Sequence, residues 1–126
     1  LIEFGGDGRP TLGVEWEFAL VDKVTRDLVN AAPELFELTT QRHGEQPRLH
    51  KEFLLNTVEL TTGIFNTVAE AADELTELIA LVGPVADSLG VDLYGAGTHP
   101  FAQWSHQLLT PGHRYEELIN RTQWWG

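Results

Sequence analysis

The sequence predicts one α+β or α/β domain in which helices cover a single sheet. Three stretches carry this prediction. Residues 11–22 alternate between apolar and polar side chains, residues 66–89 place apolar side chains at helical spacing, and residues 91–100 are typical of a strand that ends in a glycine-rich turn. The chain has 126 residues, which is a usual size for one domain.

The first strand is expected in the stretch TLGVEWEFALVD, residues 11–22. Successive side chains of a strand point to opposite faces, so this stretch has two different faces. The apolar face is predicted to be buried and consists of Leu12, Val14, Trp16, Phe18 and Leu20. The other face is polar, is narrow at Gly13, and carries Glu15 and Glu17.

The middle of the chain is expected to form a short helix and a further extended segment. Pro33 stands at a favoured helix start, which predicts a helix over residues 33–43. Residues 48–62 are predicted to be extended, with Val58 and Leu60 on the apolar face. Glu59 is then a further acid on a polar strand face.

The long helix is predicted to begin after Asn66, which is a favoured capping residue. It is expected to run to Leu89, with Gly90 as its C-terminal cap. A last helix is predicted from about His113 onward.

Composition excludes several classes of function. The net charge is −11, from 8 Lys and Arg against 19 Asp and Glu, so neither nucleic acid nor an anionic membrane is expected as a partner. No apolar run approaches the length needed to span a membrane. The chain has no cysteine, which excludes a disulfide framework, a thiolate zinc site and a cysteine nucleophile. We expect a cytoplasmic location.

Four acids differ from those on solvated helix faces: Glu15, Glu17, Glu52 and Glu59. Like charges on one strand face are destabilising, and inside a cleft they need a cation. Oxygen ligands favour a hard divalent ion such as Mg²⁺ or Mn²⁺. The pattern alone leaves a solvated sheet face as the favoured alternative.

Two further residues are candidates for the same site. His99 follows a strand in GAGTHPF, where a turn would expose an imidazole that can bind a metal. The alternative is a structural or simply exposed histidine, which is the usual state of a lone one. Arg114 follows a Pro-Gly turn at a helix start, where a cation opposes the helix dipole. That position suggests a carboxylate or phosphate clamp, with a structural salt bridge as the alternative.

Four motifs in order resemble the carboxylate–amine ligases of the glutamate–cysteine ligase type 2 family, in its actinobacterial form. They are GVEWEFALVD, HKEFLLNTVELTTG, GAGTHPFAQW and TPGHRYEEL, and they run from Gly13 to Leu118. The resemblance is to the N-terminal part of the family's catalytic domain. It implies that residues 1–126 are the N-terminal portion of a single domain.

The resemblance implies an α+β fold similar to glutamine synthetase, with a mostly antiparallel curved sheet, helices on its outer face, and an incomplete funnel in this chain. It also implies a reaction in which ATP phosphorylates the side-chain carboxylate of glutamate, and an amine such as cysteine attacks the acyl phosphate. Mg²⁺ or Mn²⁺ would be the cofactor, and ATP, glutamate and the amine would be the partners. The resemblance leaves a homo-oligomer open and predicts no turnover by this piece alone.

The resemblance also assigns residues. Glu15, Glu17, Glu52, Glu59 and His99 match positions that look like ligands of magnesium or of ATP phosphates. Arg114 and Tyr115 match an Arg-Tyr pair that looks like a substrate or phosphate contact. Two positions depart from the family pattern: Trp16 stands where a third acid is common, and Thr61 stands where arginine is common.

The spacing of Glu52 and Glu59 raises a geometric problem. An odd separation puts two residues on opposite faces of a regular strand. If both acids reach one metal, a bulge or bend must intervene, and we expect it at residues 54–56.

Two other functions remain open at this point. The chain would also suit a catalytically silent ligase-like module that binds a partner or small molecule. A phosphotransferase similar to the guanidino kinases of the same broad fold group shares the phosphoryl-transfer logic.

Overall fold

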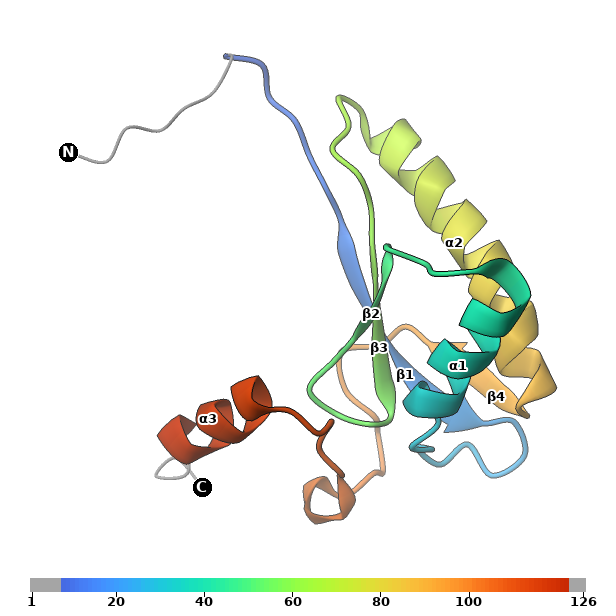
Figure 1. The fold of residues 1–126 in the computed structure, drawn as a ribbon, viewed down its shortest axis with the longest axis vertical. Coiled ribbons are helices and arrows are strands. Elements are labelled where there is room, and N and C mark those ends of the chain that lie inside the picture. The colour runs from blue at the N-terminus through green and yellow to red at the C-terminus, as the bar shows by residue number, and fades with distance from the viewer. Residues whose placement is uncertain (1–7, 123–126) are drawn as a thin grey trace.

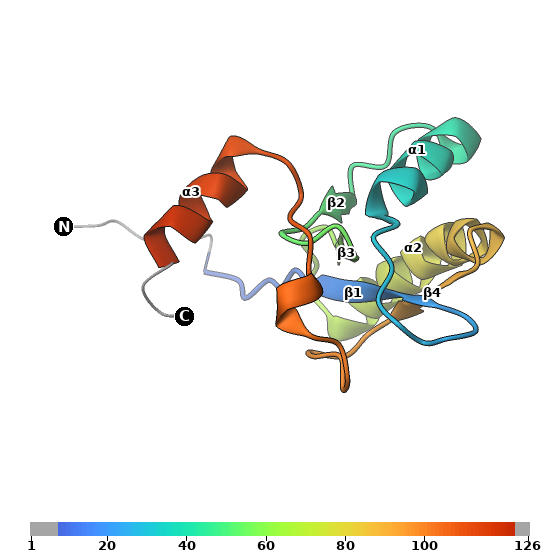
Figure 2. The same ribbon diagram turned by 90° about the horizontal axis from the view of Figure 1, so that it is seen from below.

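Residues 8–122, described in a computed structural model, form a four-stranded sheet with two helices against one of its faces (Figure 1). A third helix, α3, stands apart from α1 and α2 in both ribbon views (Figure 2). In chain order the elements are β1 (Glu15–Asp22), α1 (Ala32–His43), β2 (Leu49–Lys51), β3 (Thr57–Thr61), α2 (Val68–Ser88), β4 (Val91–Tyr94), a short 3-10 turn (Trp104–His106) and α3 (His113–Thr122).

The sheet has the order β2-β3-β1-β4, and every neighbouring pair is antiparallel. β1 therefore lies between β3 and β4. Its partners are unequal in length, because β3 pairs with residues 15–19 of β1 and β4 pairs with residues 19–22. The α+β fold with a mostly antiparallel sheet is confirmed, and the α/β alternative is not.

The core lies between the sheet and the helices α1 and α2. Their amphipathic faces meet the apolar strand face, as the helical spacing of the sequence predicts. Apolar side chains that are almost completely inaccessible come from both layers: Leu20, Val58 and Leu60 from the strands, and Leu35, Val82 and Val85 from the helices. This packing leaves the opposite sheet face free for polar side chains.

The start of α2 differs from the expectation by one residue. Thr67, not Asn66, is the N-cap, and its hydroxyl accepts a hydrogen bond from the Glu70 amide. The Glu70 carboxylate accepts in return from the Thr67 amide at 3.0 Å, which completes a capping box. Asn66 was predicted because asparagine is a favoured capping residue, but only Thr67 has an acid three residues later. At the other end, Gly90 has a φ of 73°, as expected of a residue that ends a helix.

Residues 48–62 are not one extended segment. They form β2 and β3, two antiparallel strands in which His50 lies opposite Glu59 and Lys51 lies opposite Val58. The chain reverses between them, and the bend predicted at residues 54–56 falls inside this reversal. The prediction of a bend was correct in place, and the prediction of a single strand was wrong.

Trp16 was predicted to be buried with the rest of its strand face, and this was wrong. Its side chain is 40% exposed and packs against Phe18, with 4.5 Å between ring centroids. β4 does not extend along this part of β1, so the indole has no neighbouring strand on that side.

The expected strand also begins later than Thr11, because the Val14 amide donates to the Thr62 hydroxyl in place of a backbone carbonyl.

Within residues 8–122 no helix has the length and apolar character that crossing a membrane requires.

Candidate metal site

Three of the predicted acids come together on the sheet face that the helices leave open. Glu17 of β1 lies directly opposite Glu59 of β3, and Glu52 follows the end of β2. One carboxylate oxygen from each residue lies within 4.8 Å of the others. The side chains next to Glu17 and Glu59 in sequence, Phe18 and Val58, point into the core, so the acids must point the other way.

The reversal between β2 and β3 resolves the problem of the odd spacing. In an antiparallel hairpin, residues on two strands share a face according to their pairing and not according to their separation in sequence. Because His50 pairs with Glu59, Glu52 emerges two residues further along on the same side. The turn between β2 and β3 thus serves the purpose for which a bulge or bend was expected.

A distant segment holds the hairpin turn in place. The Thr110 hydroxyl donates to the Glu52 carbonyl, and the Thr110 amide donates to the Phe53 carbonyl at 3.0 Å. The Leu55 amide donates to the Leu108 carbonyl at 2.9 Å, and the Asn56 side chain donates to that of Gln107. The backbone at Glu52 is therefore fixed by residues 107–110.

The charge on Glu59 is poorly compensated. Burial raises the pKa of Glu59, and the carboxylates of Glu15, Glu52 and Glu17 raise it further, while His50 opposes this. A carboxylate with a close cationic partner would have a lowered pKa. The site therefore favours the binding of a positive charge, and three carboxylate oxygens suit a hard divalent ion.

Glu15 lies at the edge of this cluster. It is exposed and pairs with Thr61 across β1 and β3, two residues from Glu17 on the same face. It contributes repulsion to Glu59 but is not part of the group within 4.8 Å.

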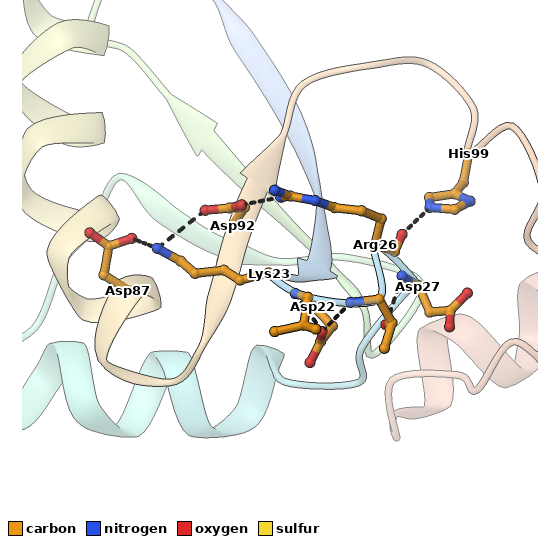
Figure 3. Close-up of polar contacts among 9 residues, drawn as sticks. Asp22, Lys23, Arg26, Asp27, Asp87, Asp92 and His99 are labelled. Carbon is orange, nitrogen blue, oxygen red and sulfur yellow. Dashed lines mark hydrogen bonds and ion pairs between the residues drawn. The ribbon is translucent and has the colours of Figure 1, made fainter.

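His99 borders the same cavity as Glu17 without joining the acids. The cavity has a volume of about 330 Å³ and is lined mainly by β1, the hairpin turn and residues 96–107. The His99 imidazole contacts backbone at both nitrogens. Its Nε2 lies 2.8 Å from the Arg26 carbonyl (Figure 3). Its Nδ1 accepts from the Ala102 amide at 3.1 Å.

Arg114 and Tyr115 lie in the first turn of α3. Among the described residues, neither forms a hydrogen bond or ion pair with the three clustered acids. The Tyr115 hydroxyl donates to the Lys51 carbonyl at 3.1 Å, and its ring packs edge-on against Phe53 at 5.8 Å. Arg114 is exposed, and no residue between 8 and 122 pairs with it. The roles expected of these two residues and of the five ligand candidates stay predictions.

His50 is a neighbour of the site that is not among the residues predicted from the sequence. It lies opposite Glu59, and its Nε2 is 3.0 Å from the Thr61 hydroxyl. The signal was present, because His50 and Glu52 are two residues apart and an extended chain puts such residues on one face.

Comparison with known proteins gives consistent results. The model of Glutamate-cysteine ligase family 2 (GCS2) matches residues 11–126. A Rhodococcus jostii protein named, provisionally, glutamate–cysteine ligase 2-2 is 60% identical over 127 aligned positions, which cover 100% of this chain and 34% of that protein.

Two further relatives carry similar provisional names. The one from Nocardioides sp., named glutamate–cysteine ligase 2-3, is 57% identical over 125 positions, covering 99% of this chain and 33% of its own. The one from Mycobacterium tuberculosis, named glutamate–cysteine ligase 2, is 53% identical over 125 positions, covering 99% and 32%. This chain thus spans about a third of the length of the curated relatives it matches. A family match over nearly the whole chain, with relatives more than half identical, shows that the chain belongs to glutamate-cysteine ligase family 2.

Proposed function

We propose that this chain supplies the metal-binding sheet of an ATP-dependent carboxylate–amine ligase that joins glutamate to an amine such as cysteine. The observation that carries the proposal is the convergence of Glu17, Glu52 and Glu59 within 4.8 Å on one open sheet face. The family and the names of the relatives support the class of reaction.

In the proposed reaction, a side-chain carboxylate oxygen of glutamate attacks the γ-phosphorus of ATP and ADP leaves. The amine nitrogen then attacks the acyl carbon of the resulting acyl phosphate. The bond between that carbon and the phosphate oxygen breaks, the amine loses a proton, and the products are an amide and inorganic phosphate. Carboxylates of the chain would repel these anionic substrates unless a cation lay between them.

Glu17, Glu52 and Glu59 would hold the cation, and Glu15 would add negative charge beside them. A bound Mg²⁺ or Mn²⁺ would offset charge on the phosphates that meet at this face. The raised pKa of Glu59 fits this role. Burial is its first cause, and a divalent ion would relieve the second, which is repulsion from the neighbouring carboxylates.

Calorimetric titration of this chain with Mn²⁺ tests the metal site directly. Glu17→Gln removes one ligand charge without changing the size of the side chain, and we expect a loss of affinity of about tenfold or more. Glu77→Gln is the matched control, because Glu77 is an exposed acid of α2. Equal affinity in the wild-type chain and in Glu17→Gln would reject the site.

Ligase activity is tested in a polypeptide that carries this chain together with the remaining length of a relative. We expect ADP release that depends on both glutamate and cysteine, and its loss in Glu17→Gln. The 126-residue chain alone is expected to show no turnover. Turnover by the chain alone, or full activity in Glu17→Gln, would contradict the proposal.

A second candidate function is a binding module without turnover. It is favoured by large apolar side chains that remain exposed beside the cavity, above all Trp104, which is 89% exposed. Such a module would bind Mn²⁺ as above, and the longer polypeptide would still release no ADP.

A further inference from the structure

We propose that His99 is a positioning residue and not a metal ligand. Its imidazole fastens the glycine-rich loop of residues 95–102 to the backbone of Arg26, in the turn that follows β1, and so sets one wall of the cavity beside Glu17. The contribution of His99 to catalysis rests on the function proposed above. The attachment of the loop to Arg26 does not depend on that function.

The hydrogen bonds of His99 define its chemical state. The Ala102 amide can only donate, so Nδ1 must accept and carries no proton. Nε2 must then carry the proton, because its partner is the Arg26 carbonyl oxygen, which can only accept. The ring is a neutral imidazole whose two in-plane sites are both used, so it offers no lone pair to a metal.

Aromatic neighbours hold the plane of this ring. Phe101 meets it edge-on with 4.4 Å between centroids, and Tyr94 does so at 6.0 Å. Phe101 belongs to the loop itself, and Tyr94 is the last residue of β4, the strand that leads into the loop. Turning a ring nitrogen toward Glu17 would break both hydrogen bonds and disturb these contacts.

The turn that receives His99 is itself well defined (Figure 3). One carboxylate oxygen of Asp22 accepts from the amides of Val24 and Thr25, at 2.8 and 2.7 Å. Arg26 has a φ of 66°, in the left-handed region that side chains other than glycine rarely adopt. Its guanidinium pairs with Asp92 of β4 at 2.6 Å. Arg26 therefore binds β4 with its side chain and His99 with its carbonyl.

The loop is confined on its other side as well. A Cβ atom on Gly95 would lie 3.0 Å from the indole of Trp16 and 3.2 Å from the ring of Phe18, so any larger residue would force these rings to shift. Gly95 against β1 and His99 bonded to Arg26 thus hold both ends of residues 95–99. Residues 96–99 of this loop line the cavity that Glu17 also lines.

The protonation pattern of His99 is the first test, measured by ¹⁵N NMR of the imidazole in this chain. We expect a bare Nδ1 and a protonated Nε2, unchanged when Mg²⁺ is added to saturation. The backbone amides of residues 17, 52 and 59 should shift in the same titration. A change in the state of either ring nitrogen when Mg²⁺ binds would overturn the proposal. If no amide shifts at all, the metal site fails, and the tautomer still decides the role of His99.

Two pairs of variants test the fastening itself, through hydrogen exchange of the Ala102 amide and of the amides in residues 95–98. Arg26→Gly and Arg26→Val both remove the guanidinium, but only glycine tolerates the left-handed φ. We expect Arg26→Val to speed exchange of these amides roughly three- to tenfold more than Arg26→Gly does.

The second pair is His99→Gln and His99→Phe. A glutamine amide can still donate to the Arg26 carbonyl, whereas phenylalanine keeps only a ring, so we expect exchange to be faster in His99→Phe. The free energy of unfolding, measured on each variant, separates local release of the loop from global destabilisation. Mn²⁺ affinity should stay within about twofold of the wild-type value in His99→Gln. Equal exchange within both pairs, or loss of Mn²⁺ binding in His99→Gln, would overturn the proposal.

Discussion

The two faces of β1 differ in their surroundings. Phe18 and Leu20 are buried against α1 and α2, where close packing stabilises the fold. Glu15 and Glu17, on the opposite face of the same strand, stay exposed among other acids. The face that stabilises the fold and the face that can hold a metal are thus separated by a single residue in sequence. The comparison predicts that substitutions on the two faces have opposite effects on stability.

The largest effect is expected on the packed face. Leu20 is completely inaccessible, so Leu20→Ala should lower the free energy of unfolding by about 2–5 kcal/mol through lost apolar contact and a residual cavity. Urea unfolding measures this. Leu118→Ala, at a residue 48% exposed, is the control and should change stability by less than about 0.5 kcal/mol. A small effect of Leu20→Ala would mean that the core of this sheet lies elsewhere.

An effect of opposite sign is expected on the acidic face. Glu59→Gln removes one of two like charges directly opposite each other in the sheet, and should raise the free energy of unfolding at pH 7 by about 0.2–1 kcal/mol without metal. The same substitution should weaken Mn²⁺ binding. Stability gained where metal affinity is lost would distinguish this face from the packed one.

The pH dependence of that effect follows from the raised pKa of Glu59. The folded state holds this proton more tightly than the unfolded state, so protonation favours folding. The advantage of Glu59→Gln over the wild-type chain should therefore be largest above the folded pKa. It should shrink as pH falls toward the ordinary value of 4.5. An advantage that grows on acidification would contradict the assignment of repulsion to Glu59.

Much of this division could be predicted from the sequence, because alternation depends only on local geometry. The alternation of residues 11–22 assigned Phe18 and Leu20 to the core and Glu15 and Glu17 to the open face. The prediction that Trp16 is buried was wrong because burial also depends on which strand lies alongside, and β4 ends before it reaches Trp16. Local pattern gives the direction of a side chain, whereas its exposure depends on residues far away in sequence.

The site shows the same limit more strongly. The sequence indicated that Glu52 and Glu59 need a break between them, and placed it correctly. It could not distinguish a bulge from a reversal, because that depends on pairing partners and on the support of residues 107–110. The contacts of His99 were equally inaccessible to pattern, since the Arg26 carbonyl lies 73 residues away.

The smallest effect on stability is expected at Asp92, where cations lie beside an acid of the open sheet face. Asp92 lies opposite Val21 on the same sheet face as Glu17, but pairs with Arg26 and Lys23. These hydrogen bonds, that of Arg26 first, lower the pKa of Asp92, in contrast to Glu59. Its contribution to stability should be present above the ordinary value of 3.8 and be lost as pH falls through the lower folded pKa.

Asp92→Asn should therefore be slightly less stable than the wild-type chain at pH 7, and the difference should vanish on acidification. Urea unfolding at several pH values, run alongside Glu59→Gln, makes the comparison. Two acids on one sheet face should then show opposite signs at neutral pH. Arg26 and Lys23 lie beside Asp92 and lower its pKa, whereas burial and neighbouring carboxylates raise the pKa of Glu59 despite the opposing effect of His50. If both substitutions changed stability in the same direction, Glu59 would be no more destabilised by its surroundings than Asp92. The electrostatic argument for a cation at Glu17, Glu52 and Glu59 would then be lost.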